Sequence, residues 1–470
     1  MRYPSFIVSG LATLLNVVVY ALTGGRFIFL EGRSWRGWYH NWSYDRCHRA
    51  RVMYPTTEDE VSEIVRASRP VRVVGSGHSF NDGLATAGAT VSLDRLAGIV
   101  SVDAGSGVVS AWAGTRLRDL NRALAEHGLA LGTLASHDAQ SLAGIVSTDV
   151  HGTGRLAAHF SDAVTGMRIV DGTGSVHAVT PDDELFKAAV GGIGAVGVIT
   201  QVSLKCEAAF NLRQASWVET RGWARRELDR LLDANDHVSF YVYPFTQLLH
   251  VHLWNRTEAP RSPFATFRES LNEAKAALGA ALIGDGAAHL GMLATKAEGG
   301  MRTQSATNLV FHSYDSFTRT LYHLHQELEF AVPAEDVWEA VDECVAIYER
   351  LYPDHDLPFL LIEVRFTPQG HERSLLGPGT GRRTAWLCLC LNQSGEVDTY
   401  FDAIERWMRT TDARPHLGKW WESGEPGELA RLHGERFAAF QRVRAGADPQ
   451  GTFSNAFTDR VLGRVTAPVQ

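Results

Sequence analysis

The sequence predicts an α+β protein with more than one domain. Between about residues 57 and 205, short apolar runs with strand character alternate irregularly with helical patterns. From about Asn211 the pattern changes to longer helices placed between strands, as in a second domain whose sheet is covered by helices. The chain has 470 residues, which is enough for two or three domains of ordinary size.

The composition is that of a folded globular protein, with 45% hydrophobic and 21% charged residues. The net charge of −8 gives no basic footprint, so we expect no nucleic-acid partner. The five cysteines are odd in number and widely scattered. This usage indicates reduced thiols and a main body on the cytoplasmic side.

The N-terminus is different, because residues 5–25 carry no charge and are long enough to span a bilayer as a helix. Several arginines follow this run, namely Arg26, Arg33 and Arg36. Positive charge after the run predicts that the segment 1–26 is an uncleaved membrane anchor with the body in the cytoplasm. A signal peptide cleaved after Ala21 and a helix packed onto the protein are the alternatives.

Two helices of the first region have predicted ends. Thr57 and Glu60 form a capping box at the start of the helix DEVSEIVRAS, which leads to the strand VRVVG. The helix LRDLNRALAEHG is expected to begin with Thr115 as its N-cap and to end at Gly128. The other expected strands of this region are ATVSLD, GVVSAWA, AVTGMRIVD, GSVHAVT and VGVITQVSLK.

The second region combines helices such as TRGWARRELDRLLDAN with strands such as HVSFYVYPF and LLHVHLW. In the run WLCLCL, strand alternation places Cys388 and Cys390 on one face. We favour buried small hydrophobic side chains for this pair, with a metal site as the alternative. The tail after about residue 428 has one long helix and a Pro/Gly loop, which we expect to pack back onto the first domain.

Two glycine motifs differ in their context. Gly192, Gly194 and Gly197 match G-x-G-x-x-G, but the helix precedes the glycines and the strand follows them. This order is the reverse of a nicotinamide dinucleotide site, so we do not assign one. The stretch VRVVGSGHSF places Gly-Ser-Gly after a strand, where its amides can form a concavity for a diphosphate or an ordinary turn.

A second histidine–glycine cluster, STDVHGTG at 147–154, makes a buried cofactor the stronger expectation. GSGHSF, HGTG and GGIGAVGVIT, in that order, resemble the FAD domain of the vanillyl-alcohol-oxidase superfamily. The resemblance extends over about residues 41–463. Within the superfamily, the motifs together resemble the aldonolactone oxidase branch, which includes gulonolactone, arabinonolactone and alditol oxidases. The further segments that carry it are Asn41-Trp42, EVRF at 363–366, RPHLGK at 414–419 and DPQGTFSN at 448–455.

The resemblance implies a two-domain vanillyl-alcohol-oxidase-type fold. An α+β FAD-binding domain would span 41–207, and a substrate (cap) domain with a helix-covered antiparallel sheet would span 208–425. The C-terminal segment 426–470 would return to the FAD domain.

The resemblance also implies FAD as the cofactor, bonded covalently to His78, with a noncovalent histidine contact as the alternative. The residues that would cradle the diphosphate are Val74, Gly75, Ser76, Gly77, His78, Ser79 and Phe80. Those near the flavin would be Ser141, Ala143, Gly144, Ser147 and His151. Val198 and Ile199 would lie near the adenine end.

The strand FLLIEVRF is the predicted chemical site. Glu363 and Arg365 share one face of this strand, and charged groups in an apolar strand are costly to bury unless they pair or serve a ligand. An ion pair on a solvated face is the alternative. The resemblance implies that Arg365 and Lys419 position and stabilise the substrate oxygen, and that Glu363 binds a hydroxyl or takes its proton.

The expected activity is therefore oxidation of an alcohol carbon of a sugar-derived lactone or polyol by hydride transfer to flavin N5. Oxygen is the expected electron acceptor, giving hydrogen peroxide, with Ala143 at the position of a small residue that controls oxygen access. Two departures from the family pattern are Asp149, where glycine is usual, and Leu417, where tryptophan is usual.

The Asp149 arrangement resembles the decaprenylphosphoryl-ribose oxidase branch, so a membrane-associated oxidase of a lipid-linked sugar is an alternative. A flavoprotein fold that has lost catalysis and serves as an interaction module is another.

Overall fold

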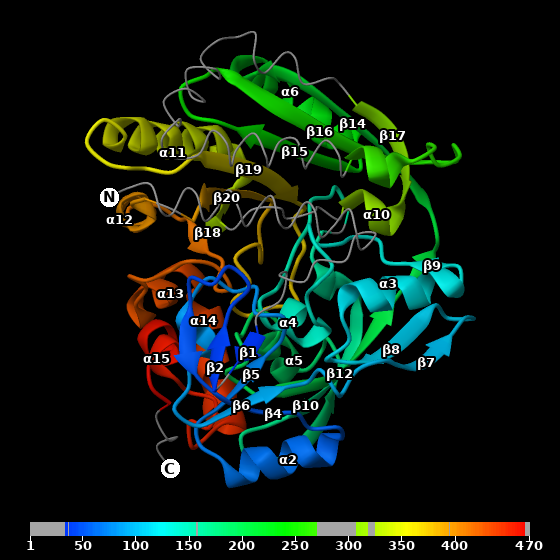
Figure 1. Ribbon diagram of the computed structural model, residues 1–470, viewed down its shortest axis with the longest axis vertical. Helices are drawn as coiled ribbons and strands as arrows, with labels where there is room; N and C mark the ends of the chain where they lie inside the picture. The colour runs from blue at the N-terminus through cyan, green and yellow to red at the C-terminus, as the bar shows by residue number, and fades with distance from the viewer. Residues whose placement is uncertain are drawn as a thin grey trace.

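The computed structural model describes residues 33–35, 37–156, 158–269, 307–317, 325–393 and 395–465 (Figure 1). The apolar segment 1–26, for which we predict an anchor, lies outside these ranges. Within them, no helix is both long enough and apolar enough to cross a membrane.

The first domain is built on three small sheets. A parallel sheet in the order β4-β6-β5 contains β4 (Arg51–Met53), β5 (Val71–Val74) and β6 (Ala89–Ser92). An antiparallel sheet in the order β11-β10-β12-β8-β7 contains β7 (Ile99–Asp103), β8 (Val108–Trp112), β10 (Val164–Val170), β11 (Val176–Val179) and β12 (Val198–Lys205). The third sheet is β1 (Arg33–Trp35), β2 (Trp38–His40) and β3 (Cys47–Arg49).

The helices of this domain are α2 (Glu58–Ala67), α3 (Leu117–Glu126), α4 (Leu142–Ser147) and α5 (Glu184–Ala189). Helix α2 begins as predicted, because the Thr57 side chain accepts a hydrogen bond from the Glu60 amide. The predicted N-cap of α3 is wrong. Thr115 Oγ1 donates to the Trp112 carbonyl at 2.6 Å, and the helix begins one residue later, after Arg116.

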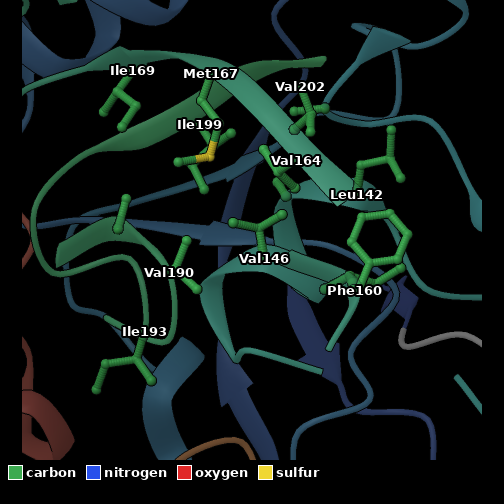
Figure 2. Packing of buried hydrophobic residues seen from close by; sticks show 14 of the residues in the cluster. Leu142, Val146, Phe160, Val164, Met167, Ile169, Val190, Ile193, Ile199 and Val202 are labelled. Carbon is green, nitrogen blue, oxygen red and sulfur yellow. The ribbon is translucent and has the colours of Figure 1, made fainter. Parts of the chain in front are cut away.

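Helix α4 is held in place by the core of the first domain. A six-residue helix is too short to be stable alone, so its position depends on packing. Its side chains Leu142 and Val146 are buried against Phe160 and Val164 and against residues of the antiparallel sheet, as Figure 2 shows. This packing fixes the N-terminal end of α4, which carries Ser141 as its N-cap.

The cap domain is an eight-stranded sheet in the order β17-β14-β16-β15-β19-β20-β18-β21, antiparallel at every pairing. Its strands are β14 (Asn211–Thr220), β15 (His237–Val242), β16 (Leu248–Thr257), β17 (Thr307–His312), β18 (His325–Pro333), β19 (Leu360–Thr367), β20 (Thr384–Asn392) and β21 (Arg414–Pro415). A two-stranded ladder of β9 (Leu129–Ala130) and β13 (Glu207–Ala208) precedes it.

One face of the cap sheet packs on α6 (Arg221–Ala234), α11 (Val337–Leu351) and α12 (Val397–Met408), while the short helix α10 (Ser313–Phe317) follows β17. The apolar side chains of β19 belong to this core, namely Leu360, Ile362, Val364 and Phe366. The predicted α+β class and the predicted helix-covered antiparallel sheet are confirmed. The opposite face of β19 carries Glu363 and Arg365.

The C-terminal helices lie against the first domain in Figure 1, where they are drawn in orange and red beside the blue strands. They are α13 (Pro426–His433), α14 (Glu435–Ala447) and α15 (Ala456–Leu462). Phe440 and Phe457 are buried in the same core as α4 and β12. Arg72 reinforces this junction, since its guanidinium donates to the carbonyls of Gly83, Ile193 and Phe453 at 2.7–2.8 Å.

Candidate active site

A single large cavity runs from the first domain to the charged face of the cap sheet. It encloses about 1540 Å³ of empty space, counted together with its open mouth. Its walls come from the loop after β5, from α4, from the loop before β12, and from β18, β19 and the segment 416–419. Elements that are far apart in the sequence therefore form one chamber.

All the residues that the sequence analysis assigned to cofactor binding line this cavity. They are Val74, Gly75, Ser76, Gly77, His78, Ser79, Phe80, Ser141, Ala143, Gly144, Ser147, His151, Val198 and Ile199. Arg365 and Lys419 line it as well. Glu363 is not among the lining residues, although its Oε2 lies 3.9 Å from Nε of Arg365.

The loop Gly75–Gly77 packs closely against the start of α4, where a side chain at its first position would displace the Ser141 hydroxyl. A Cβ atom on Gly75 would lie 2.4 Å from Oγ of Ser141, which is far inside van der Waals contact. Gly77 has φ +69°, in the left-handed region that favours glycine. The two glycines thus turn the chain after β5 and point His78 along the cavity wall.

His78 lies between two other rings. Its imidazole stacks on Trp42 at 5.2 Å between centroids, and the ring of His137 lies 4.1 Å away on a tilted plane. Burial lowers the pKa of His137 to about 3, so that ring is neutral at physiological pH. The Trp42 amide also donates to the Gly77 carbonyl at 3.0 Å, which attaches the opening segment to the glycine loop.

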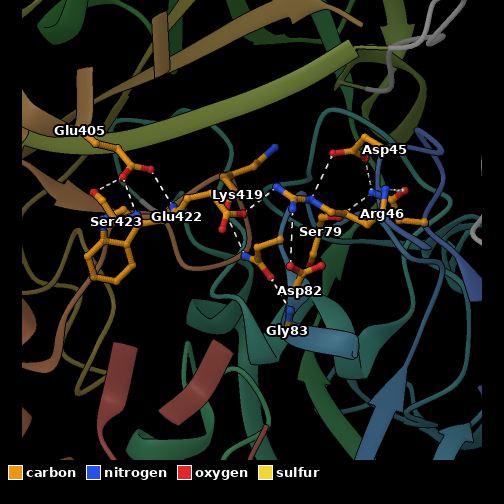
Figure 3. Close-up of polar contacts among 12 residues, drawn as sticks. Asp45, Arg46, Ser79, Asp82, Gly83, Glu405, Lys419, Glu422 and Ser423 are labelled. Carbon is orange, nitrogen blue, oxygen red and sulfur yellow. Dashed lines mark hydrogen bonds and ion pairs between the residues drawn. The ribbon is translucent and has the colours of Figure 1, made fainter. Parts of the chain in front are cut away.

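The late segment 414–419 is tied directly to the end of the GSGHSF loop. The Phe80 amide donates to the Gly418 carbonyl at 3.1 Å, and the Asn81 amide group donates to the carbonyls of Leu417 and Lys419 at 2.8 and 2.9 Å. Arg46 closes the same region from outside, since it pairs with Glu422 at 2.7 Å and lies 3.5 Å from Asp82 (Figure 3).

The walls suit a flavin dinucleotide. The buried wall atoms without a hydrogen-bond partner among the described residues include Trp42 Nε1, His137 Nδ1, Gln140 Oε1 and Arg365 Nε. Buried polar groups are normally paired, so these atoms are available to a bound polar ligand or to ordered water. Gly194 also faces the cavity with φ +67° and nothing within 4 Å of an added Cβ, which leaves room for a close approach.

Arg365 is paired with a residue that the sequence analysis did not single out. Its Nη2 lies 2.5 Å from Oε1 of Glu329, and both side chains are almost fully buried. Burial opposes both charges, but the pair raises the pKa of Arg365 and lowers that of Glu329. His151 Nε2 lies 3.2 Å from the same Glu329 oxygen. Its pKa is lowered to about 3, by burial first and then by Arg365.

Lys419 lies at the same end of the cavity, with its Nζ against Oε2 of Glu327. Burial lowers the pKa of Lys419 to about 7, so this ammonium group titrates near physiological pH. The two carboxylates Glu327 and Glu329 occupy alternate positions of β18 and therefore share one face of the sheet. The cavity wall thus carries a guanidinium and an ammonium group, each paired with a carboxylate of β18, and such cationic groups suit stabilisation of a negative oxygen.

Asp149, which we noted as a departure from the family pattern, does not line the cavity. Its φ of +51° explains why glycine is usual there. Its Oδ2 accepts from His371 Nε2 at 3.0 Å and lies 3.4 Å from His159 Nδ1, and His371 Nδ1 bonds Asp162 at 3.0 Å. This buried network joins the first domain to the loop between β19 and β20.

Several wall residues were not predicted by the sequence analysis. Glu327 and Glu329 lie within the strand HQELEFAVP, where their alternation is visible but their partners are not. Arg72 is a lone cation inside the apolar run VRVVG, an exception that marks it as a buried donor. His137 and Gln140 follow no motif.

The comparisons with known proteins agree with this geometry. The family described as D-arabinono-1,4-lactone oxidase matches residues 202–461, and the family described as FAD binding domain matches residues 50–180. The likeness to cholesterol oxidase from Brevibacterium sterolicum has a TM-score of 0.72 at 16% identity, over 92% of this chain and 98% of that one. It shows the fold, which is of the predicted vanillyl-alcohol-oxidase type.

Three curated relatives each match about nine-tenths of the chain. L-gulono-1,4-lactone dehydrogenase of Mycobacterium tuberculosis is 28% identical over 430 residues, 90% of this chain and 98% of the relative. L-gulonolactone oxidase of Bos taurus is 26% identical over 455 residues, with the same two shares. Alditol oxidase of a Streptomyces species is 26% identical over 440 residues, again with 90% and 98% covered.

Proposed function

Since the chain belongs to the D-arabinono-1,4-lactone oxidase family, we propose that it is an FAD-dependent oxidoreductase that oxidises an alcohol carbon of a sugar-derived lactone or polyol. FAD, when bound, supplies N5 as the acceptor of the hydride from that carbon. The relatives named as gulonolactone and alditol enzymes support this substrate class.

One observation supports the proposal most strongly. The cavity that contains the GSGHSF loop also contains the guanidinium of Arg365 and the ammonium of Lys419, whose Nζ lies 5.2 Å from the ring centroid of Phe80 in that loop. Loss of the hydroxyl proton builds up negative charge on the alcohol oxygen as the hydride leaves the neighbouring carbon. Two cationic groups in a chamber away from bulk water are well suited to stabilise that charge.

The roles follow from the contacts. Arg365 is held rigidly by Glu329, so it can orient an oxygen without losing side-chain freedom during the reaction. Lys419 adds a second positive charge from the segment 416–419. Glu363 lies 3.9 Å from Nε of Arg365 but is not among the lining residues. Its proposed role, binding a second hydroxyl or accepting the proton, would require its carboxylate to turn into the cavity.

The finer features of the cofactor are also proposed here. A covalent bond to His78 is supported by its place on the cavity wall, between Trp42 and His137. We propose oxygen as the electron acceptor, with Ala143 beside the flavin.

We also propose that the segment 1–26 attaches the enzyme to the cytoplasmic face of a membrane, on the basis of its apolar sequence and the arginines that follow it.

The test uses the purified holoenzyme under anaerobic conditions with aldonolactones, alditols and lipid-linked pentoses. Bleaching of the flavin by a lactone or alditol is the expected result. Bleaching by the lipid-linked pentose alone would replace the substrate class, and no bleaching by any of them would favour a non-catalytic module. Glu363→Gln, Arg365→Ala and Lys419→Ala should each slow bleaching by about 10²–10³.

A matched control is Arg382→Ala. Arg382 is a cation of the cap domain that does not line the cavity, and it donates to backbone carbonyls of Ala331 and Asp412. Its loss should leave the rate of flavin reduction near that of the wild type. Unchanged reduction in all three site variants would mean that the pocket lies elsewhere.

A further inference from the structure

Two cysteines lie beside the proposed substrate site without a part in the proposed reaction. Cys388 and Cys390 occupy alternate positions of β20, and the prediction that strand alternation places them on one face is confirmed by an Sγ–Sγ distance of 3.6 Å. The strand register places Cys390 opposite Glu327 and Cys388 opposite Glu329 on β18. The thiols therefore share a sheet face with the carboxylates that pair with Lys419 and Arg365.

The third member of this group is Glu327. Its Oε1 lies 3.7 Å from Sγ of Cys390, and the two sulfur atoms and this carboxylate together offer three ligand atoms within 4.8 Å of one another. His325 Nε2 lies 2.8 Å from the same Oε1, which directs this oxygen toward the sulfur atoms. The other carboxylate oxygen, Oε2, faces Lys419.

The Sγ–Sγ distance of 3.6 Å and the Sγ–Oε1 distance of 3.7 Å are close to the ligand separations around a tetrahedral ion, whereas the strand spacing does not suit a disulfide. With Zn–S bonds of about 2.3 Å and Zn–O bonds of about 2.1 Å, tetrahedral ligands lie about 3.8 Å apart for two sulfurs and about 3.6 Å apart for sulfur and oxygen. The Cα atoms of residues i and i+2 in a strand are about 6.6–6.8 Å apart, which is at the upper limit of the Cα–Cα distance in a disulfide. An ion can therefore bind here without moving the strand.

A second cluster with metal-ligand residues, Asp149, His159 and His371, is less suitable. The two imidazoles stack face to face, with centroids 3.7 Å apart and planes 4° from parallel. The lone pairs of a ring nitrogen lie in the ring plane, so two parallel stacked rings cannot both direct them at one ion. The sulfur cluster has no such obstacle.

We propose that Cys388, Cys390 and Glu327 form a binding site for a thiophilic divalent cation such as Zn²⁺, and that the bound ion inhibits the enzyme. Thiolate sulfur with one carboxylate oxygen is a donor set that Zn²⁺ accepts, with water as the fourth ligand. Glu327 lines the cavity and Cys390 is only half-buried, which gives the ion a route of entry.

The inhibition rests on the proposed function and acts through Lys419. Binding of Zn²⁺ would release the two thiol protons, so the net charge of the site would not change. The carboxylate of Glu327 would become a ligand of the ion and would no longer be free to hold the ammonium of Lys419. Lys419 would then shift from its position, and the substrate oxygen would lose one stabilising charge. Cys388 and Cys390 would act only through Glu327 and Lys419, so neither cysteine needs to contact the substrate.

The experiment uses the FAD-loaded, full-length enzyme, reduced with a phosphine and freed of it by gel filtration. Equilibrium dialysis against micromolar ZnCl₂, followed by atomic absorption, should find one zinc bound per wild-type chain. Cys388→Ser and Cys390→Ala should each weaken binding at least about tenfold. Cd²⁺ should produce a thiolate-to-metal absorption band in the ultraviolet that both variants lack.

Cys47→Ser and Cys206→Ser are the matched controls, because these thiols lie in the first domain and outside the cluster. Both should bind zinc as the wild type does. The site is overturned if the wild type binds no zinc under these conditions, or if the cluster variants bind it as tightly. A normal flavin spectrum and thermal midpoint in each variant establish that it is folded.

The inhibitory step is measured separately as the rate of anaerobic flavin reduction by substrate, with and without zinc. Zinc should slow the wild type and both controls at least tenfold and leave Cys390→Ala unaffected. Equal slowing of Cys390→Ala would overturn inhibition through this site. Because zinc binding is measured without substrate, a failure of the proposed function would show in the zinc-free reduction and not in the dialysis.

Discussion

The carboxylate of Asp149 accepts a hydrogen bond from Nε2 of His371 at 3.0 Å, across the boundary between the two domains. Burial opposes a charge on His371, but Asp149 and Asp162 raise its pKa to about 10. Asp149 in turn has a pKa well below its ordinary value, because His371 and His159 outweigh its burial. The pair is therefore charged throughout the neutral range.

His371→Asn should lower the free energy of unfolding by about 3–5 kcal/mol near pH 6, because it leaves a buried carboxylate without its partner. A histidine whose pKa is raised on folding contributes its full stabilisation of the folded state below its unfolded pKa of about 6.5. This contribution is lost as the pH rises through about 10. Urea unfolding between pH 6 and pH 10 should thus show the difference between wild type and variant shrinking with pH.

The control is His177→Asn. His177 pairs with Asp171 at 2.7 Å, but its side chain is 42% exposed, so its loss should cost only about 0–1 kcal/mol. Equal losses for the two variants would contradict the role of the buried network.

His78→Ala should abolish covalent attachment of FAD. The wild-type flavin should stay with the polypeptide through acid precipitation and fluoresce on a denaturing gel, whereas the variant should release all of its flavin. His137→Ala, which removes the neighbouring ring at 4.1 Å but not the proposed attachment atom, is the control and should retain attached flavin. Release of free FAD from the wild type would rule out the covalent bond.

Lys419 should give flavin reduction a pH limb near neutrality. Because burial lowers its pKa to about 7, the stabilising ammonium is present below that pH and is lost above it. Anaerobic reduction by substrate should slow as the pH rises through about 7. Lys419→Arg keeps its charge over the whole range, so this limb should disappear even if the absolute rate falls. An unchanged limb in Lys419→Arg would assign the titration to another group.

Ala143 should control the reaction of reduced flavin with oxygen. It is almost fully buried and lines the cavity at the start of α4, where one methyl group decides whether a diatomic molecule can pass. Ala143→Gly should speed reoxidation of the photoreduced enzyme in stopped-flow experiments, and Ala143→Leu should slow it. The same rate in wild type and both variants would show that Ala143 is not the gate.

The apolar segment 1–26 should direct the enzyme to a membrane. The full-length protein is expected in the membrane fraction, with its main body accessible to protease only from the cytoplasmic side, and removal of residues 1–26 should release it. A full-length protein found in the supernatant, or a body protected from cytoplasmic protease, would contradict the anchor.

Features that depend on neighbouring residues could be read from the sequence. The capping box of α2 follows from the spacing of Thr57 and Glu60, and the two faces of β19 follow from strand alternation. That Glu363 and Arg365 share one face of β19 could be predicted without the tertiary structure. The resemblance to the vanillyl-alcohol-oxidase superfamily, carried by the ordered motifs, supplied the wall residues of the cavity, whereas the glycine spacing alone left an ordinary turn open.

The tertiary structure decided which partner each charged group has. Glu329 meets Arg365 only because β18 and β19 both pair with β20, and Asn81 meets Lys419 only because the segment 416–419 folds back over the glycine loop. Local propensity and alternation fix the direction of a side chain within its own element. The register between elements depends on packing of the whole core, so contacts between residues 36 or 338 positions apart were determined only in the folded chain.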